Sequence, residues 1–166
     1  MEMYVTAEKF AELYPNAPSD AYTRFAWDAQ RYIDNATMTV DGVKKLQYAV
    51  PTDEDDAEAV QRCMCAVINA LTEVDAARTA VNAAGGYVET ESGYRSANVK
   101  SISAGGESIT YGSDSSSESD IAKAARSNGE LKAYVLSIIE SYLRGTRDDN
   151  GVNLLYGGRY PVRRWC

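Results

Sequence analysis

The chain has 166 residues, no histidine and a formal net charge of −7 at pH 7. Without histidine it can form neither a Ser-His-Asp triad nor a Cys-His dyad, and it can neither ligate zinc through imidazole nor use imidazole as a pH switch. The acidic balance argues against a general nucleic-acid binder, and no apolar run approaches the roughly 18–20 residues that cross a membrane.

The composition is that of a globular domain made in a reducing compartment. Apolar residues make up 45% and charged residues 25% of the chain, and the length predicts one domain with a sizeable core. The three cysteines are an odd number, which does not suit a disulfide framework. Residues 1–10 include two glutamates and no apolar core, so we expect no signal peptide.

Charge is distributed unevenly along the chain. Residues 1–60 carry 5 Lys/Arg against 12 Asp/Glu, and residues 61–143 carry 7 against 10. Residues 144–166 carry 5 against 2, which makes the C-terminal segment basic. This asymmetry suggests that an aromatic, basic tail binds a different partner from the acidic body; the alternative is a solvated C-terminus.

Two helices are predicted at the start of the chain. The first runs from Thr6, which can cap it, to Tyr14, just before Pro15. The second begins after Ser19-Asp20. Its apolar side chains recur at helical spacing and form one face, made of Tyr22, Phe25, Ala26, Ala29, Ile33 and Ala36.

The edge of this face and the segment after it are less regular. Trp27 and Tyr32 fall beside the apolar face and are expected to widen it. Asp41-Gly42 then indicates a turn. Residues 43–50 are compatible with either a short helix or an extended segment, which Pro51 closes.

The strongest helical pattern covers residues 53–84. Its apolar positions alternate in steps of four and three, at Val60, Met64, Val67, Leu71, Val74 and Val81. Arg78 takes one expected apolar place, the acidic residues 53–56 suit the positive end of the helix dipole, and Gly85-Gly86 ends the helix. At about 45 Å, such a helix needs partner helices or neighbouring subunits to bury its apolar stripe.

Period-two alternation predicts a β-hairpin at about 97–112. Residues 98–103 and 107–111 alternate between polar and apolar side chains, and Ala104-Gly105-Gly106 between them is a turn signal. A two-stranded hairpin is marginal in water, so it must pack on helices or pair with a neighbouring chain. A serine-rich link follows, from residue 112 to residue 119.

Two helical segments and an aperiodic tail complete the chain. Ser119-Asp120 can cap a segment through Ala125, and residues 130–144 form a helix with a broad apolar face that ends at Gly145. The tail is rich in glycine and in aromatic side chains. The tail is so apolar that we expect its side chains to be covered by other protein groups and not left in solvent.

The tail contains the residue types that are enriched at interface hot spots, namely Tyr, Trp and Arg. The candidate contacts to a partner or a neighbouring subunit are Leu154, Leu155, Tyr156, Arg159, Tyr160, Arg163, Arg164 and Trp165. The alternative is that the tail folds back and covers the chain's own helices.

No residue pattern indicates catalysis. Residues 53–56 could hold a divalent cation in a hydrolase, but adjacent helix positions point in different directions, which favours a dipole cap. Cys63 and Cys65 lie roughly 200° apart around a helix, so they cannot share a metal ion and are expected in or near the core. Residues 148–151 lack the glutamate that completes a calcium loop. We expect no enzymatic activity, no cofactor and no metal site.

Four short stretches carry a family resemblance. Residues 4–10 read as a strand followed by a capped helix. Residues 29–37 end a helix with Tyr-Ile-Asp-x-x-Thr, and residues 57–66 open a long helix. Residues 154–158, Leu-Leu-Tyr-Gly-Gly, are similar to a terminal Leu-Leu-Tyr-Arg-Gly element, with Gly157 where Arg is frequent. Together they resemble the head–tail connector (adaptor) family of long-tailed double-stranded DNA phages.

The resemblance implies a structural virion protein without catalytic residues. Such proteins are helical bundles that form a closed homo-oligomeric ring, usually a dodecamer, beneath the portal protein. Their tails dock onto the portal or a neighbouring subunit, downstream neck or tail proteins attach on the far side, and DNA passes through the channel without sequence-specific binding. The implied location is the virion neck, after synthesis in the host cytoplasm and without a membrane partner.

The sequence therefore predicts a mainly α fold. We expect a helical bundle at 1–145 with one long central helix and the inserted β-hairpin, followed by an extended C-terminal docking tail at 146–166. The expected function is a connector ring subunit that joins the portal to downstream neck or tail components. The alternative is a soluble helical adaptor or regulatory protein that binds a protein partner.

Overall fold

The computed structural model describes residues 3–84, 87–90, 93–96, 101–104, 107–110 and 119–160, and for residues 81–110 it describes the backbone alone. Two compact units make up the chain. The first unit contains Met1–Thr72 and Lys132–Cys166, and the second contains Glu73–Leu131. In the described part of the chain, no helix combines the length and the apolarity needed to cross a membrane.

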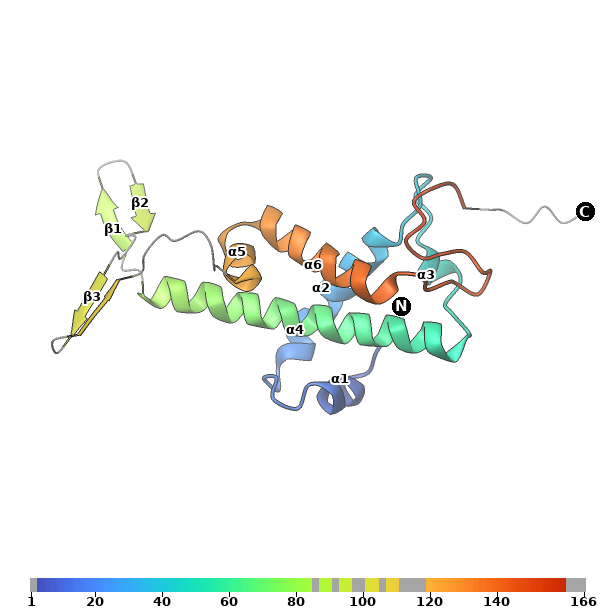
Figure 1. Cartoon of the computed structure of the whole chain (residues 1–166), viewed down its shortest axis with the longest axis horizontal. Helices are drawn as coiled ribbons and strands as arrows, with labels where there is room; N and C mark the ends of the chain where they lie inside the picture. Colours follow the sequence, from blue (N-terminus) through green and yellow to red (C-terminus); the bar gives the residue numbers. More distant parts are fainter. Residues whose placement is uncertain are drawn as a thin grey trace, which may run out of the picture. The chain divides into compact units, whose positions relative to one another are not determined.

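The fold is mainly α, as predicted, and Figure 1 shows the elements in chain order. The helices are α1 (Ala7–Leu13), α2 (Ala21–Ala36), α3 (Lys45–Tyr48), α4 (Glu54–Ala84), α5 (Asp120–Arg126) and α6 (Asn128–Leu143). Helix α3 is a single turn in the segment that the sequence left ambiguous. It follows a turn in which Gly42 has a φ of +81°, a backbone conformation that favours glycine.

Local capping interactions set the starts of α1, α4 and α5, whereas the residues before α2 and α3 make no side-chain capping bond. The Thr6 hydroxyl accepts a hydrogen bond from the Lys9 amide at 3.3 Å, and the Ser119 hydroxyl accepts one from the Ala122 amide at 3.2 Å. At the start of α4, the Asp53 carboxylate accepts the amide of Asp55 at 3.1 Å and that of Asp56 at 3.2 Å. The predicted acidic cap of the long helix is thus confirmed.

The predicted buried stripe of α4 is confirmed from Val60 to Val74, and the side chain of Val81 lies outside the described residues. Val60, Met64, Val67 and Leu71 are buried in the first unit, and Val74 is buried in the second. On α2, Ala26, Ala29 and Ile33 are buried, but the expected widening of the face by Trp27 is wrong, because that ring is 58% exposed. Polar Gln30 and Asp34 are buried on α2 instead.

Arg78 explains the break in the apolar pattern of α4. In the second unit its guanidinium Nε donates to the Ala125 carbonyl at 3.1 Å, and Nη2 contacts the Asn128 side-chain oxygen at 3.3 Å. The Ala125 carbonyl lies in the last turn of α5, where carbonyls have no partner within their own helix. A long cationic side chain therefore serves this position better than an apolar one.

In chain order, the strands of the second unit follow α4 and precede α5. Strand β1 (Tyr87–Thr90) pairs with β2 (Gly93–Ser96), and β3 (Ser101–Ala104) pairs with β4 (Glu107–Thr110), both antiparallel. The β1–β2 pair was not anticipated from the sequence. Strands β3 and β4 fall where the sequence predicts a hairpin. Its turn glycines and its outer residues lie outside the described residues, so the hairpin as a whole stays a prediction.

The C-terminal segment differs from the expected extended tail. Residues 146–160 fold back on the first unit as a loop with a β-bridge between Arg147 and Asn153. Leu154 is fully buried and Tyr160 is 8% exposed. The physical reason is that their apolar surface finds partners within the same chain. In Figure 1 the red C-terminal segment runs next to α3.

Candidate functional site

The candidate site is built on the segment from residue 146 to residue 160, here called the tail loop. Its backbone is bonded to itself: the Leu154 amide donates to the Thr146 carbonyl at 2.9 Å, and the Asp148 amide donates to the Val152 carbonyl at 2.9 Å. Gly151 turns the chain with a φ of +76°. These bonds give the tail loop a defined shape.

Asp148 is the internal anchor of the tail loop. Its buried carboxylate accepts the amides of Asn150 at 3.0 Å and Val152 at 2.8 Å, and it accepts the Tyr160 hydroxyl at 2.5 Å. Burial, together with the hydrogen bond to Asp148, raises the pKa of Tyr160 to about 12. Residues 148–151, which lack the glutamate of a calcium loop, therefore form a turn in which the Asp148 carboxylate bonds backbone amides of the same segment.

Lys45 joins the tail loop to α3. Its side chain is completely buried, and its ammonium group donates to the Leu154 carbonyl at 2.7 Å and to the Tyr156 carbonyl. The ring centroid of Tyr156 lies 5.9 Å from Nζ. Burial lowers the pKa of Lys45, while the negative charge of Asp148 opposes that shift.

Three further contacts attach the tail loop to the segments around α3. The Val40 amide donates to the Gly157 carbonyl at 3.1 Å, and the Thr52 hydroxyl donates to the Asp149 carboxylate at 2.6 Å. The ring of Tyr48 meets that of Tyr160 edge to face, with centroids 5.5 Å apart. Lys45 at the start of α3 and Tyr48 at its end thus both contact the tail loop.

The predicted contact residues separate into two groups. Leu154 and Tyr160 are buried within the first unit, so in the isolated chain they anchor the loop. Leu155 is half-buried, whereas Tyr156 is 52% exposed and Arg159 is exposed. The remaining three, Arg163, Arg164 and Trp165, lie outside the described residues.

Exposed apolar side chains gather on the segments that bond to the tail loop. Val40 is 74% and Tyr48 71% exposed, although both lie on segments attached to the loop. We call the exposed side chains of Val40, Tyr48, Tyr156 and Arg159 the α3–tail surface. No sequence pattern marks Val40, Tyr48 and Lys45 as site residues, because their proximity to the tail arises from contacts between residues more than a hundred positions apart along the chain.

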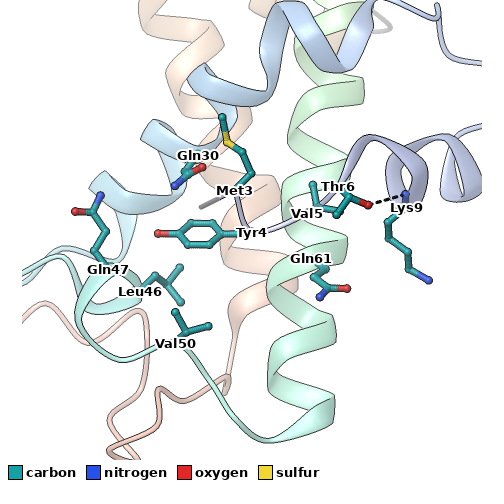
Figure 2. A pocket seen from close by; sticks show the side chains of 10 residues that line it. All are labelled: Met3, Tyr4, Val5, Thr6, Lys9, Gln30, Leu46, Gln47, Val50 and Gln61. Carbon is teal, nitrogen blue, oxygen red and sulfur yellow. Dashed lines mark hydrogen bonds between the residues drawn. The ribbon is translucent and has the colours of Figure 1, made fainter. Parts of the chain in front are cut away.

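A pocket of about 780 Å³ lies elsewhere in the first unit, between the N-terminal segment and α1 to α4. Figure 2 shows Tyr4 among its lining side chains, with carboxamides from three helices. The lining residues are Met3, Tyr4, Val5, Thr6, Lys9, Gln30, Leu46, Gln47, Val50 and Gln61. The lining combines the Tyr4 ring with aliphatic and neutral polar side chains, and Lys9 lies at its edge (Figure 2).

Asp34 ties the N-terminal segment to α2 and α3 at the edge of this pocket. Its buried carboxylate accepts the Tyr4 hydroxyl at 2.5 Å and the Gln47 carboxamide, and the Lys44 ammonium lies 3.8 Å away. Burial and the adjacent carboxylate both raise the pKa of Tyr4. Asp34 is the aspartate of the motif at 29–37, and here it has a structural role.

The cysteines on α4 are core residues, as predicted. Cys63 and Cys65 are both fully buried. Burial raises the pKa of Cys63 to about 12 and that of Cys65 to about 11, so neither thiol ionises near neutral pH. Within the described residues, no group of three or more Cys, Asp or Glu side chains is placed to hold a metal ion.

Comparison of the chain with protein-family models, with curated proteins and with solved structures finds no match.

Proposed function

We propose that the chain is a subunit of a head–tail connector ring in a long-tailed phage and that it docks onto the portal protein through the α3–tail surface. Downstream neck or tail proteins attach to the opposite side of the ring. The observation that supports docking is the exposure of Val40, Tyr48 and Tyr156 on segments that are fastened to each other.

Leaving these apolar side chains in water costs free energy that a docking partner would recover. Single exposed apolar residues are ordinary, but neighbouring ones rimmed by polar groups mark interaction sites. Tyr and Arg are also the residue types that dominate binding energy at protein interfaces. Tyr156 and Arg159 are therefore the proposed portal contacts, Leu154 and Tyr160 are their anchors, and Arg163, Arg164 and Trp165 remain proposed contacts beyond the described residues.

The charge distribution supports the same proposal. A conduit through which DNA must slide should not bind phosphates tightly, and the acidic residues 1–60 would weaken such binding. The basic residues 144–166 would then serve contacts with protein, not with DNA. In this proposal the ring is homo-oligomeric, with the twelve subunits that are usual in the family that the chain resembles, and its subunits carry out no chemistry.

The test measures docking to the portal protein of the phage that carries this chain. Purified wild-type chain is mixed with assembled portal. The fraction of chain bound to portal is measured by sedimentation, and the complexes are viewed by electron microscopy. Wild-type chain is expected to form a ring on the portal, whereas Tyr156→Ala with Arg159→Glu is expected to lose attachment. Trp27→Ala is the matched control, because Trp27 is an equally exposed aromatic residue on α2.

Two outcomes contradict this proposal. If the double variant attaches as well as the wild-type chain, the α3–tail surface is not the docking site. If the wild-type chain forms a small defined complex with another protein and never a ring, the alternative of a soluble helical adaptor is correct.

A further inference from the structure

Lys45 presents an unusual combination of burial and charge. Its side chain is completely buried, yet no carboxylate of the described residues lies within ion-pair distance of its ammonium group. Two of the three ammonium donors go to backbone carbonyls of the tail loop. Burial of a charge is expensive unless it is hydrogen-bonded, so Lys45 and the tail loop depend on each other.

Internal bonds determine the shape of the tail loop, whereas bonds to other segments determine its position. Asp148 and the bridge between Arg147 and Asn153 close it internally. Attachment to α3 and its neighbours depends on Lys45, on the Val40 amide and on peripheral side-chain contacts. Lys45 makes two charge-assisted hydrogen bonds from a fully buried position, whereas the charge-assisted bond from Thr52 to Asp149 is single and exposed to solvent, so Lys45 is the main determinant of where the loop sits.

Both carbonyls that Lys45 binds belong to the part of the loop that carries the exposed contacts. Leu154 and Tyr156 flank Leu155, and Tyr156 itself is 52% exposed. The Tyr156 ring also lies over the Lys45 ammonium at 5.9 Å, within the range of a cation–π contact. Lys45 thus acts on the backbone and the ring of the residue proposed to touch the portal.

We propose that Lys45 is the positioning residue of the α3–tail surface: its buried ammonium group clamps the tail loop so that Tyr156 and Arg159 are presented together with Tyr48 and Val40. The surface is therefore preformed on the free chain, and its partner offers an apolar recess for the aromatic rings. The docking part of this inference rests on the proposed function, but the clamp itself does not.

The clamp is tested on the isolated full-length chain by amide hydrogen exchange. The Val40 amide, bonded to the Gly157 carbonyl, reports attachment of the loop, and the Thr39 amide, bonded to the Val43 carbonyl at 3.0 Å, is the internal reference. In Lys45→Met, Val40 exchange should accelerate roughly 100-fold, because two charge-assisted bonds are lost, while Thr39 exchange stays unchanged.

The matched control is Lys44→Met. Lys44 is adjacent in the chain, has a 39% exposed side chain and pairs with Asp34 instead of the tail loop. Its loss should leave Val40 exchange at the wild-type rate. Unchanged Val40 exchange in Lys45→Met, or equal acceleration in both variants, overturns the clamp. If Lys45→Met loses helical circular dichroism, Lys45→Gln replaces it, with about tenfold acceleration expected because a neutral donor remains.

The docking role is tested by a double-mutant cycle on portal binding. If Lys45 acts by presenting Tyr156, then Lys45→Met and Tyr156→Ala each weaken binding, and the double variant binds no worse than the weaker single variant. Fully additive losses, or unweakened binding by Lys45→Met, overturn the positioning role. Failure of the wild-type chain to bind portal refutes the proposed function alone, because the exchange result remains.

Discussion

Replacing Leu154 with alanine decides whether the tail loop is part of the fold in solution. Leu154 is fully buried in the first unit, and its carbonyl binds the Lys45 ammonium. Truncation leaves the backbone bond in place but removes the buried side chain and leaves a cavity. Leucine-to-alanine changes at buried sites cost about 2–5 kcal/mol, through lost transfer energy and imperfect collapse.

The measurement is urea unfolding of wild-type chain and Leu154→Ala, followed by circular dichroism. Urea unfolding should show a loss of about 2–5 kcal/mol in the free energy of unfolding. In thermal unfolding, the same loss would lower the melting temperature by roughly 4–20 °C for a chain of this size. Leu155→Ala is the matched control, since Leu155 is half-buried and should cost distinctly less. Equal stabilities of Leu154→Ala and wild type, within about 0.5 kcal/mol, would refute the packing argument, because they would mean that the loop is detached in solution.

Three further predictions use the same chain. Asp53→Ala should destabilise the protein by about 0.5–2 kcal/mol in urea unfolding, because the carboxylate caps α4 through two amides; an unchanged midpoint would contradict the cap. Because the pKa of Tyr160 is raised to about 12, the stability that its protonated hydroxyl contributes should be complete below about pH 10 and lost as the pH rises through about 12. The ultraviolet titration of wild type minus that of Tyr160→Phe should isolate one tyrosine with a raised pKa, and an ordinary pKa in this difference would contradict burial of the hydroxyl. Cys63 and Cys65 should react with a thiol reagent only after unfolding, and fast modification of either in the native chain would contradict their burial.

Local chemistry accounts for the parts of the fold that the sequence predicts well. Thr6, Asp53 and Ser119 begin helices because their side chains bond amides two or three residues ahead, an interaction that needs no distant partner. The stripe on α4 follows helical period, and the same period fails at Arg78 for a reason visible only in space. Periodicity locates the centre of a buried face but not its width, which is why the exposure of Trp27 was not foreseen.

The candidate site is harder to predict because its main residue contradicts local expectation. A lysine in a short segment between Lys44 and Leu46 reads as a solvated charge, since lysine is rarely buried. Its burial requires two carbonyls from residues 154 and 156, which no local pattern announces. Tail residues such as Tyr160 were recognised as apolar, but the same composition suits a docking tail and a tail that folds back.

Local sequence patterns suffice to predict the mainly helical fold, the capped starts of α1, α4 and α5, and the apolar, basic character of the C-terminal segment. Only the tertiary structure shows that Leu154 and Tyr160 are buried, that Tyr156 and Arg159 face solvent, and that the Lys45 ammonium group bonds two carbonyls of the tail loop. The physical reason is the range of the interactions. Helix caps and periodic faces act over a few residues, whereas burial of a charge depends on groups that meet only when the chain has folded.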